Sequence, residues 1–285
     1  MTSPVREFYD ALAADYHLIF PDWDTSMTAQ ARALDGIVRA RLGAGPHRML
    51  DCSCGIGTQA IGLARAGHRV VGSDLSPAAV ARAAAEAAAR DAVLPVTVAD
   101  MRELPYRDAV FDAVVCADNS LPHLLTADDI RTALAGMRRV LRDGGLLVLT
   151  VRDYDGIRAA RPTSTPPQVS TTARGRAVTF QLWHWHDDGE RYDLEHFQLV
   201  PAADGGWEVR VRRTAYWALT RRELSEAVAD SGFSEVGWHE PEASGFYQPV
   251  LTARRTQPSE KSDGASEKAF RRPEDCGILR PCRRS

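Results

Sequence analysis

The chain has 285 residues, of which 44% are hydrophobic and 26% are charged. This length accommodates one large domain or two small ones, and the composition is ordinary for a globular protein. The formal net charge is -3, and no basic stripe appears before residue 256. Because a basic patch is the electrostatic mark of nucleic-acid binding, we expect a small-molecule partner and no nucleic acid.

No apolar run approaches the roughly 20 residues that a membrane helix requires, and the N-terminus lacks the charged and then apolar layout of a signal peptide. We therefore expect a cytoplasmic protein with no membrane partner. The spacing of the cysteines suggests neither a disulfide framework nor a zinc site, so no metal is expected. They are Cys52, Cys54, Cys116, Cys276 and Cys282.

Residues 1–45 are predicted to form two helical pieces, Val5 to Asp15 and Thr28 to Leu42. The second piece carries apolar residues at helical spacing. The segment between them, residues 16–23, is dense in aromatic side chains. The N-terminal region is therefore expected to be helical and to precede the first strand.

From Pro46 to Arg152, apolar and β-branched stretches alternate with helical patterns. Such alternation implies a parallel sheet covered on both faces, that is, a doubly wound α/β fold. Ligands of such sheets bind beyond the carboxyl ends of the strands. The predicted elements are strand 48–52, helix 57–66, strand 69–73, helix 77–90, strand 95–99, strand 110–116, helix 127–141 and strand 145–151.

After the fifth strand the pattern changes, and residues 176–218 alternate like half-exposed antiparallel strands. Two turns rich in Asp and Gly divide them into a predicted meander of three strands. We interpret residues 153–219 as an antiparallel cap inserted over the ligand edge of the sheet. Residues 220–255 then supply a helix and two strands, and residues 256–285 lose apolar periodicity and are expected to be disordered.

A glycine turn joins the first strand to the first helix of the alternating region. Gly55 and Gly57 lack the Cβ atoms that would block a ligand from the backbone, and the amides of the following helix favour a polar or anionic group. The spacing Gly55-x-Gly57-x-x-Ala60 also fits a dinucleotide-binding fingerprint. The turn alone therefore leaves an NAD-dependent oxidoreductase open.

Each of the first three strands is followed by an aspartate: Asp51, Asp74 and Asp100. Asp51 would repel a pyrophosphate but can accept a hydrogen bond from a ligand ammonium group. Asp74 can take both hydroxyls of a ribose, and Asp100 can accept from an adenine amino group. The series fits a ligand with an amino-acid end, a ribose and an adenine, which describes S-adenosylmethionine.

On these residues, the stretch from about Pro46 to Thr150 resembles a class I S-adenosylmethionine-dependent methyltransferase, with Ser53 in place of the first glycine of the D-x-G-x-G-x-G pattern. The resemblance implies a Rossmann-like sheet of about seven strands, closed by a hairpin from residues 220–255. It also implies that residues 1–45 form an N-terminal helical lid over the cofactor. Tyr9 and Tyr16 are the lid residues expected to contact it, although packing of the helices is an equal alternative.

Two further stretches resemble the glycine and sarcosine N-methyltransferases. Asn119, Ser120, His123 and Leu124 match the family's N-S-x-x-H-L, and Arg152, Tyr154 and Asp155 match its H-R-N-Y-D, with Asp153 in place of the asparagine. In that family the asparagine helps to hold the substrate and the arginine pairs with the substrate carboxylate. A guanidinium suits that task because it presents two parallel donors.

The expected cofactor residues are Tyr9, Tyr16, Asp51, Ser53, Gly55, Gly57, Asp74, Leu75, Asp100, Met101 and Ala117. The expected catalytic residues are His123, Asn119, Arg152 and Tyr16. His123 is the nearest base for a hydroxyl acceptor, or else it bonds a backbone carbonyl.

The expected reaction is methyl transfer to the nitrogen of an amino acid or a related small amine, with a carboxylate on the acceptor as one option. Small-molecule O-methylation, an NAD-dependent oxidoreductase and a non-catalytic cofactor-binding module are the alternatives. A homo-oligomer is compatible with the sequence.

Overall fold

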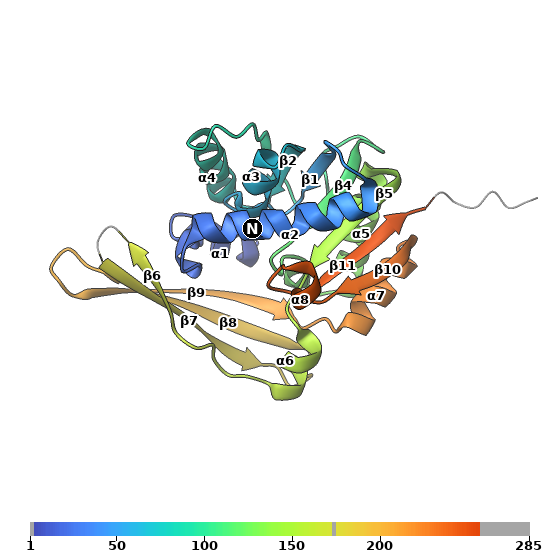
Figure 1. Ribbon diagram of the computed structural model, residues 1–285. Helices are drawn as coiled ribbons and strands as arrows, with labels where there is room; N and C mark the ends of the chain where they lie inside the picture. The colour runs from blue at the N-terminus through green and yellow to red at the C-terminus, as the bar shows by residue number, and fades with distance from the viewer. Residues whose placement is uncertain (1–2, 173–174, 257–285) are drawn as a thin grey trace, which may run out of the picture.

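The computed structural model describes residues 3–172 and 175–256. Two sheets make up its framework, a large one among helices and a smaller one below it (Figure 1). The disorder predicted for residues 256–285 concerns a segment that, apart from Thr256, lies outside the described residues. Within the described residues, no helix is long and apolar enough to cross a membrane.

The main sheet has seven strands in the order β10-β11-β5-β4-β1-β2-β3. The strands β1 to β5 run parallel, and β11 pairs antiparallel with both β5 and β10. The prediction of a doubly wound sheet of about seven strands with an antiparallel cap is confirmed. The strands are β1 (Arg48–Asp51), β2 (Arg69–Asp74), β3 (Val96–Val98), β4 (Phe111–Cys116), β5 (Leu141–Thr150), β10 (Phe233–His239) and β11 (Val250–Arg255).

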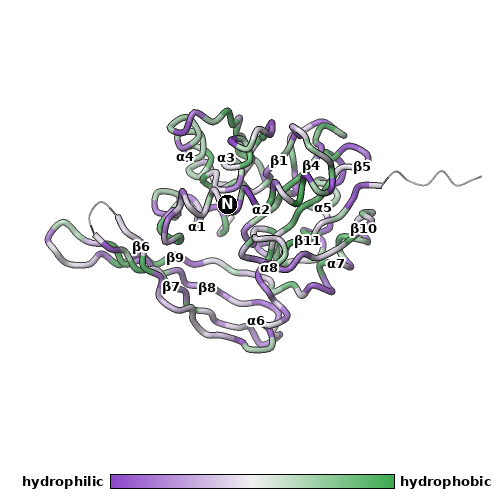
Figure 2. The backbone as a smooth tube through the Cα atoms, viewed as in Figure 1, coloured by the Kyte–Doolittle hydropathy of each residue, from purple (hydrophilic) through white to green (hydrophobic). Residues whose placement is uncertain are grey.

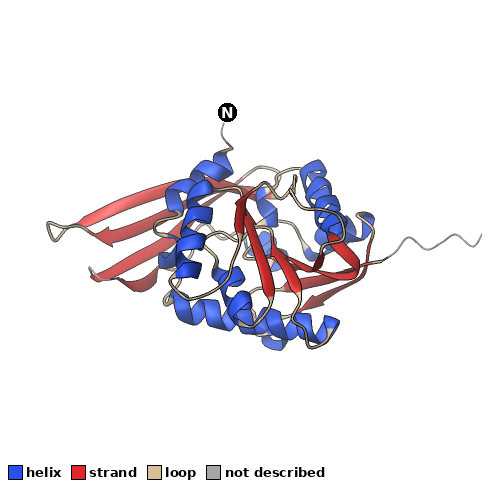
Figure 3. Ribbon diagram, turned by 90° about the horizontal axis from the view of Figure 1, so that it is seen from above, coloured by secondary structure: helices blue, strands red, loops and turns tan. Residues whose placement is uncertain are grey.

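The two faces of this sheet bury different helices, as the view from above shows (Figure 3). Successive residues of a strand point to opposite faces. Met49 therefore packs with one group of helices and Leu50 with the other. The first group is α2 (Trp23–Leu42), α3 (Thr58–Arg65) and α4 (Pro77–Ala88), and the second is α5 (Ala127–Val140) and α7 (Arg221–Asp230).

The cap is a sheet of four antiparallel strands: the predicted meander of three strands over residues 176–218 is confirmed as β7 to β9, and a fourth strand was not predicted. The extra strand, β6, is short and directly follows two prolines, and its register is set by pairing with β7 rather than by its own pattern. The four strands are β6 (Gln168–Thr172), β7 (Gly175–Trp185), β8 (Arg191–Pro201) and β9 (Trp207–Trp217).

The N-terminal region is helical, with α1 (Pro4–Leu12), a 3₁₀ turn η1 (Tyr16–Ile19) and α2. Helix α2 begins at Trp23, five residues before the predicted Thr28, because the side chain of Asp22 accepts a hydrogen bond from the amide of Thr25 at 2.9 Å. The short helices α6 (Tyr154–Ala160) and α8 (Pro241–Ser244) were not predicted. The division into a lid (1–45), a core (46–152), a cap (153–219) and a closing unit (220–255) stays a prediction.

Helices α2 and α3 approach each other so closely that Gly62 has no room for a side chain. A Cβ there would lie 2.5 Å from the Cβ of Ala31 and 3.0 Å from the carbonyl oxygen of Met27. We predict that Gly62→Ala lowers the free energy of unfolding by about 1–3 kcal/mol through overpacking. Denaturant unfolding measures this change.

The matched control is Gly36→Ala in α2, where a Cβ would meet nothing within 4 Å. Alanine favours a helix interior by about 1 kcal/mol over glycine, so this variant should be as stable as the native protein or slightly more stable. If both variants behaved alike, the close approach of α2 and α3 would not be the cause.

Candidate active site

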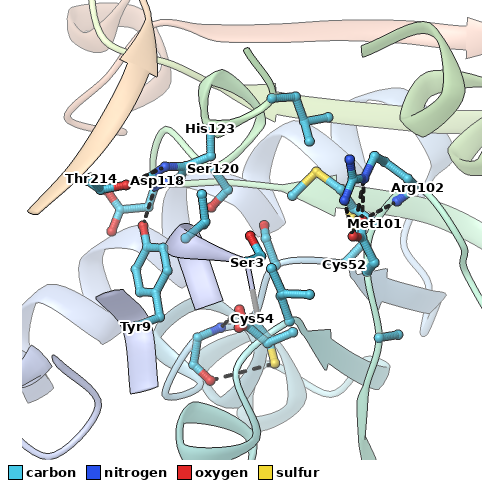
Figure 4. A pocket seen from close by; sticks show the side chains of 18 of the residues that line it. Ser3, Tyr9, Cys52, Cys54, Met101, Arg102, Asp118, Ser120, His123 and Thr214 are labelled. Atoms are coloured by element: carbon cyan, nitrogen blue, oxygen red, sulfur yellow. Dashed lines mark hydrogen bonds and ion pairs between the residues drawn. The ribbon is translucent and has the colours of Figure 1, made fainter. Parts of the chain in front are cut away.

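A cavity of about 390 Å³ lies at the carboxyl-end edge of the main sheet, beneath α1 (Figure 4). The segments that follow β1, β2, β3 and β4 all contribute to its lining, because the carboxyl ends of parallel strands lie at one edge of a sheet. Most of the predicted cofactor residues line it. They are Tyr9, Tyr16, Ser53, Gly55, Asp74, Leu75, Asp100 and Met101, together with His123.

The glycine turn forms one wall of this cavity, held by the carboxylate of Asp74. One oxygen of Asp74 accepts from the amide of Gly55 at 2.8 Å, and the other accepts from the amide of Ser76 at 2.9 Å. Gly55 has a φ of 52°, and a Cβ there would meet no protein atom within 4 Å, which leaves that space to a ligand. Gly57, with a φ of 98°, does not line the cavity, and a Cβ there would collide with Ile61 at 2.6 Å.

Asp51 lies buried behind this wall. Its Oδ1 accepts a hydrogen bond from the amide of Ser53 at 3.3 Å, but its Oδ2 has no partner. Burial raises the pKa of Asp51 to about 7, the hydrogen bond from Ser53 opposes the rise, and nearby Asp74 adds to it. Asp51 does not line the cavity, and its buried oxygen without a donor is an unsatisfied acceptor behind the wall, which the ammonium group of an amino-acid ligand would satisfy.

Asp100 is held on the opposite wall by Arg102. The guanidinium grips both carboxylate oxygens, with Nη2 at 2.7 Å from Oδ2, and it also donates to Asp129 at 2.7 Å. Burial raises the pKa of Asp100, but the side-chain and backbone hydrogen bonds from Arg102 outweigh it and hold that pKa below its usual value. Asp100 is thus an ionised acceptor at the end of the cavity next to β3, the edge strand of the main sheet.

Helix α1 covers the cavity and is fixed on two sides. On the core side, Asp10 accepts from the hydroxyl of Ser76 at 2.5 Å, next to Asp74. On the cap side, Asp15, just after α1, forms ion pairs with Arg210 and Arg212 of β9 at 2.5 and 3.1 Å. The N-terminal segment therefore joins the core to the cap above this cavity.

His123 is a neutral acceptor in this structure. Its Nδ1 lies 3.3 Å from the carbonyl oxygen of Ala215, which can only accept, so Nδ1 carries the proton and Nε2 accepts from the hydroxyl of Tyr9 at 2.7 Å. Burial lowers the pKa of His123 to about 3, and the positive charge of Arg152 acts in the same direction. The structure thus shows the backbone-carbonyl contact considered above for this histidine.

Asn119, Arg152 and Ala117 lie outside the lining of this cavity. Asn119 has a φ of 64° and is buried, and its amide is used internally: Oδ1 accepts from the backbone amide of Arg152 at 3.1 Å, and Nδ2 donates to the hydroxyl of Tyr154 at 2.9 Å. Asn119 therefore fixes the backbone that carries Arg152.

The guanidinium of Arg152 lies against neutral and aromatic groups. It donates to the hydroxyl of Tyr192 at 2.8 Å and to the Oε1 of Gln181 at 3.3 Å. Its carbon lies 4.9 Å from the ring centre of Trp183 and 5.2 Å from that of Tyr216. In residues 3–172 and 175–256 it forms no ion pair with a carboxylate.

A second cavity, of about 410 Å³, is lined by Arg152, and Asp118 borders both cavities. One oxygen of Asp118 accepts from the hydroxyl of Tyr16 at 3.0 Å, and the other accepts from the hydroxyl of Tyr247. The sequence reasoning missed Asp118. Its position two residues after β4 and directly before Asn119 was the available signal, because β1 and β2 also end in aspartate at this edge.

Comparisons with known proteins agree with this geometry. Residues 49–145 match the family described as a methyltransferase domain. Rat glycine N-methyltransferase is 32% identical over 244 residues, which cover 79% of this chain and 81% of the relative. The chain belongs to the class I S-adenosylmethionine-dependent methyltransferases. This membership removes the NAD-dependent alternative.

Other relatives of this methyltransferase chain match shorter stretches. The glycine/sarcosine N-methyltransferase of Parasynechococcus marenigrum is 40% identical over 157 residues, which cover 53% of this chain and 55% of the relative. The chain spans about half the length of the first curated relatives it matches. The amino pentose methyltransferase CalS10 of Micromonospora echinaspora, solved with S-adenosylmethionine bound, has a TM-score of 0.67 at 23% identity and covers 86% of this chain and 97% of its own, which shows a shared fold.

The raised pKa of Asp51 makes cofactor binding depend on pH. Near pH 7 the free protein holds a proton on about half of the Asp51 carboxyls, and an ammonium ligand requires the ionised form. We predict that the Kd of S-adenosylhomocysteine, measured by calorimetry, rises about tenfold for each pH unit below about 7 and levels off above it.

Asp51→Asn should remove this slope and weaken binding at pH 8. Asp108→Asn is the control, because Asp108 is an exposed carboxylate paired with Arg139 away from the cavity. A slope that persisted in Asp51→Asn would assign the titrating proton to another group.

Proposed function

We propose that this protein transfers a methyl group from S-adenosylmethionine to the nitrogen of a small acceptor that carries a carboxylate, as an amino acid does. The observation that carries the proposal is the guanidinium of Arg152, which lies beside the second cavity without an anionic partner in the described residues.

An acceptor carboxylate would supply the missing anion. Desolvating a cation is costly unless an opposite charge or good hydrogen bonds compensate. Around Arg152 the compensation comes from two neutral acceptors and from the faces of Trp183 and Tyr216. The planar fork of the guanidinium matches a carboxylate better than it matches a hydroxyl or an amide.

Asp118 gives the same cavity a negative end toward the cofactor. Its side chain lines both cavities, so a positively charged amine would be drawn toward Asp118 while the acid group stays near Arg152. A zwitterion fits this charge arrangement when it binds, and its ammonium group must release a proton to solvent before the nitrogen lone pair can attack the methyl group. A neutral alcohol does not use the arrangement.

When bound, S-adenosylmethionine supplies an electrophilic methyl group for an in-line displacement, so the protein mainly has to align the acceptor and exclude water. Helix α1 and the cap enclose the cavity and serve the second task. A hydroxyl acceptor would need a base. His123, with a pKa near 3 and its Nε2 engaged by Tyr9, is poorly suited to be one, which favours nitrogen over oxygen.

A panel of matched acceptors tests the proposal. Glycine and N-methylglycine carry both groups, methylamine lacks the carboxylate, and glycolate has a hydroxyl in place of the amine. We expect S-adenosylhomocysteine formation with acceptors that carry both groups and none with the other two. Turnover of glycolate would establish O-methylation, and equal turnover of methylamine would remove the carboxylate requirement.

Arg152→Ala is predicted to raise the KM of the acceptor about 100-fold while the Kd of S-adenosylhomocysteine changes less than about twofold, because hydrogen bonds to charged groups contribute about 1.5–3 kcal/mol. The control is Arg158→Ala, whose guanidinium pairs with Glu190 and Glu223 instead. Equal losses in acceptor and cofactor binding would place Arg152 in a structural role.

A further inference from the structure

The two faces of the cap sheet differ in what covers them. Residues paired across neighbouring strands share a face. The inner face, which includes Ala177, Trp183, Tyr192, Leu194 and Tyr216, is buried in the core of the molecule. Helix α1, η1 and the 3₁₀ turn η2 (Leu121–His123) contact the cap through inner-face residues such as Arg212, Ala177 and Thr214.

The outer face carries apolar residues on all four strands, although the structure places no helix on it (Figure 1). Its four most exposed members are Val169, Trp207, Val209 and Val211, with exposed fractions of 49%, 56%, 56% and 38%. In Figure 2, hydrophobic residues gather at the end of the cap where β6 and β9 lie. The outer-face set, which we call the outer apolar face, is Val169, Val178, Phe180, Leu182, Phe197, Leu199, Pro201, Trp207, Val209 and Val211.

We propose that the outer apolar face is the contact between two copies of this chain, which pack their cap sheets face to face. Contiguous exposed apolar surface of this kind marks an interaction site. The inference concerns assembly and does not rest on the proposed function.

The size of the face suits a homodimer. Three of its strands have 11 residues. With a rise of about 3.4 Å per residue and a spacing of about 4.8 Å between strands, these three strands and the five-residue β6 present about 600 Å² on this side, which is the lower end of what each partner contributes to a stable interface. A stable interface of standard size takes about 800 Å² from each partner, and two sheets stack about 10 Å apart with their side chains interleaved.

The charges on the same face are self-complementary. Beyond the apolar residues, Glu195 accepts from Arg213 at 2.7 Å and lies 3.5 Å from His184, so both signs are present at one end. A second copy offers the same donors and acceptors, as a two-fold contact requires. An anionic lipid surface would call for a uniformly basic rim, whereas this face carries Asp193 and Glu195 as well as Arg176 and Arg213.

The chain's own C-terminal segment suits this face poorly. Residues 257–285 are dominated by charged and polar residues and contain Phe270, Ile278 and Leu279 as their large apolar side chains. In addition, β11 ends on the opposite side of the molecule from the turn between β8 and β9 (Figures 1 and 3).

Light scattering coupled to size-exclusion chromatography of the full chain tests the proposal. We expect the native protein to elute with twice the chain mass at micromolar concentration. Val209→Glu should raise the dimer Kd on the order of 100-fold or more, because it places an unpaired charge in the apolar contact. Val93→Glu, a residue that is 84% exposed outside the cap, is the matched control and should remain dimeric.

Trp207→Ser is a second variant in case Val209→Glu misfolds, and its expected effect has the same direction. Unchanged circular dichroism and unchanged S-adenosylhomocysteine binding establish that each variant is folded. A native protein that is monomeric, or Val209→Glu and Trp207→Ser proteins that are folded and still dimeric, would overturn the proposal. So would a native monomer that sediments with vesicles of anionic lipid, since the face would then bind a membrane surface.

Discussion

The parallel sheet imposes one electrostatic constraint on this molecule: it brings three aspartates to the same edge. Asp51 is buried, and the negative charge of nearby Asp74 adds to the rise of its pKa, while burial and the charge of Asp10 raise the pKa of Asp74. The structure meets this constraint in three ways. Backbone amides donate to Asp74, and the guanidinium of Arg102 pairs with Asp100. Asp51 has an oxygen without a donor, so its charge can be balanced by a proton or by a cationic ligand.

A second separation of charge lies across the boundary between the two cavities. Arg152 is positive and lies under the cap, and Asp118 is negative and lines both cavities. Both follow strands of the main sheet, β5 and β4, but the groups around them come from elsewhere. Tyr192 and Gln181 belong to the cap, Tyr16 to the N-terminal segment and Tyr247 to the loop before β11. The strands of the core thus carry the two charged residues, and the inserted and terminal segments supply the neutral side chains that hydrogen-bond to them.

Much of the fold could be predicted from the sequence because the strands of the core are apolar in continuous runs and their helices begin with recognisable caps such as Ser76. The aspartates of the cofactor edge follow from the same reasoning, since their place depends on strand ends alone. Strand β6 could not be foreseen, because five residues of mixed polarity become a strand only by pairing with β7.

The contacts of the side chains near the second cavity, which Arg152 lines, were harder to predict than their positions. Asn119 was expected to hold substrate, but its amide is occupied by Tyr154 and by the backbone of Arg152, as its left-handed conformation allows. Asp118 was missed, although it stands beside Asn119. Its hydrogen bond with Tyr247 joins residues 129 positions apart, and a local sequence pattern cannot predict such a pair.

The two attachments of α1 differ in their chemistry, and this has a consequence for how the protein responds to ionic strength. On the cap side Asp15 forms ion pairs with two arginines, one of which, Arg212, also donates to the carbonyl oxygen of Ala11. On the core side Asp10 accepts from a hydroxyl, and Arg82 donates to the carbonyl oxygens of Ala13 and Ala14. Dissolved salt screens pairs of charges more strongly than short hydrogen bonds to neutral groups. A concentrated salt solution would therefore weaken the ion pairs of Asp15 with the cap more than the hydrogen bonds that hold α1 on the core.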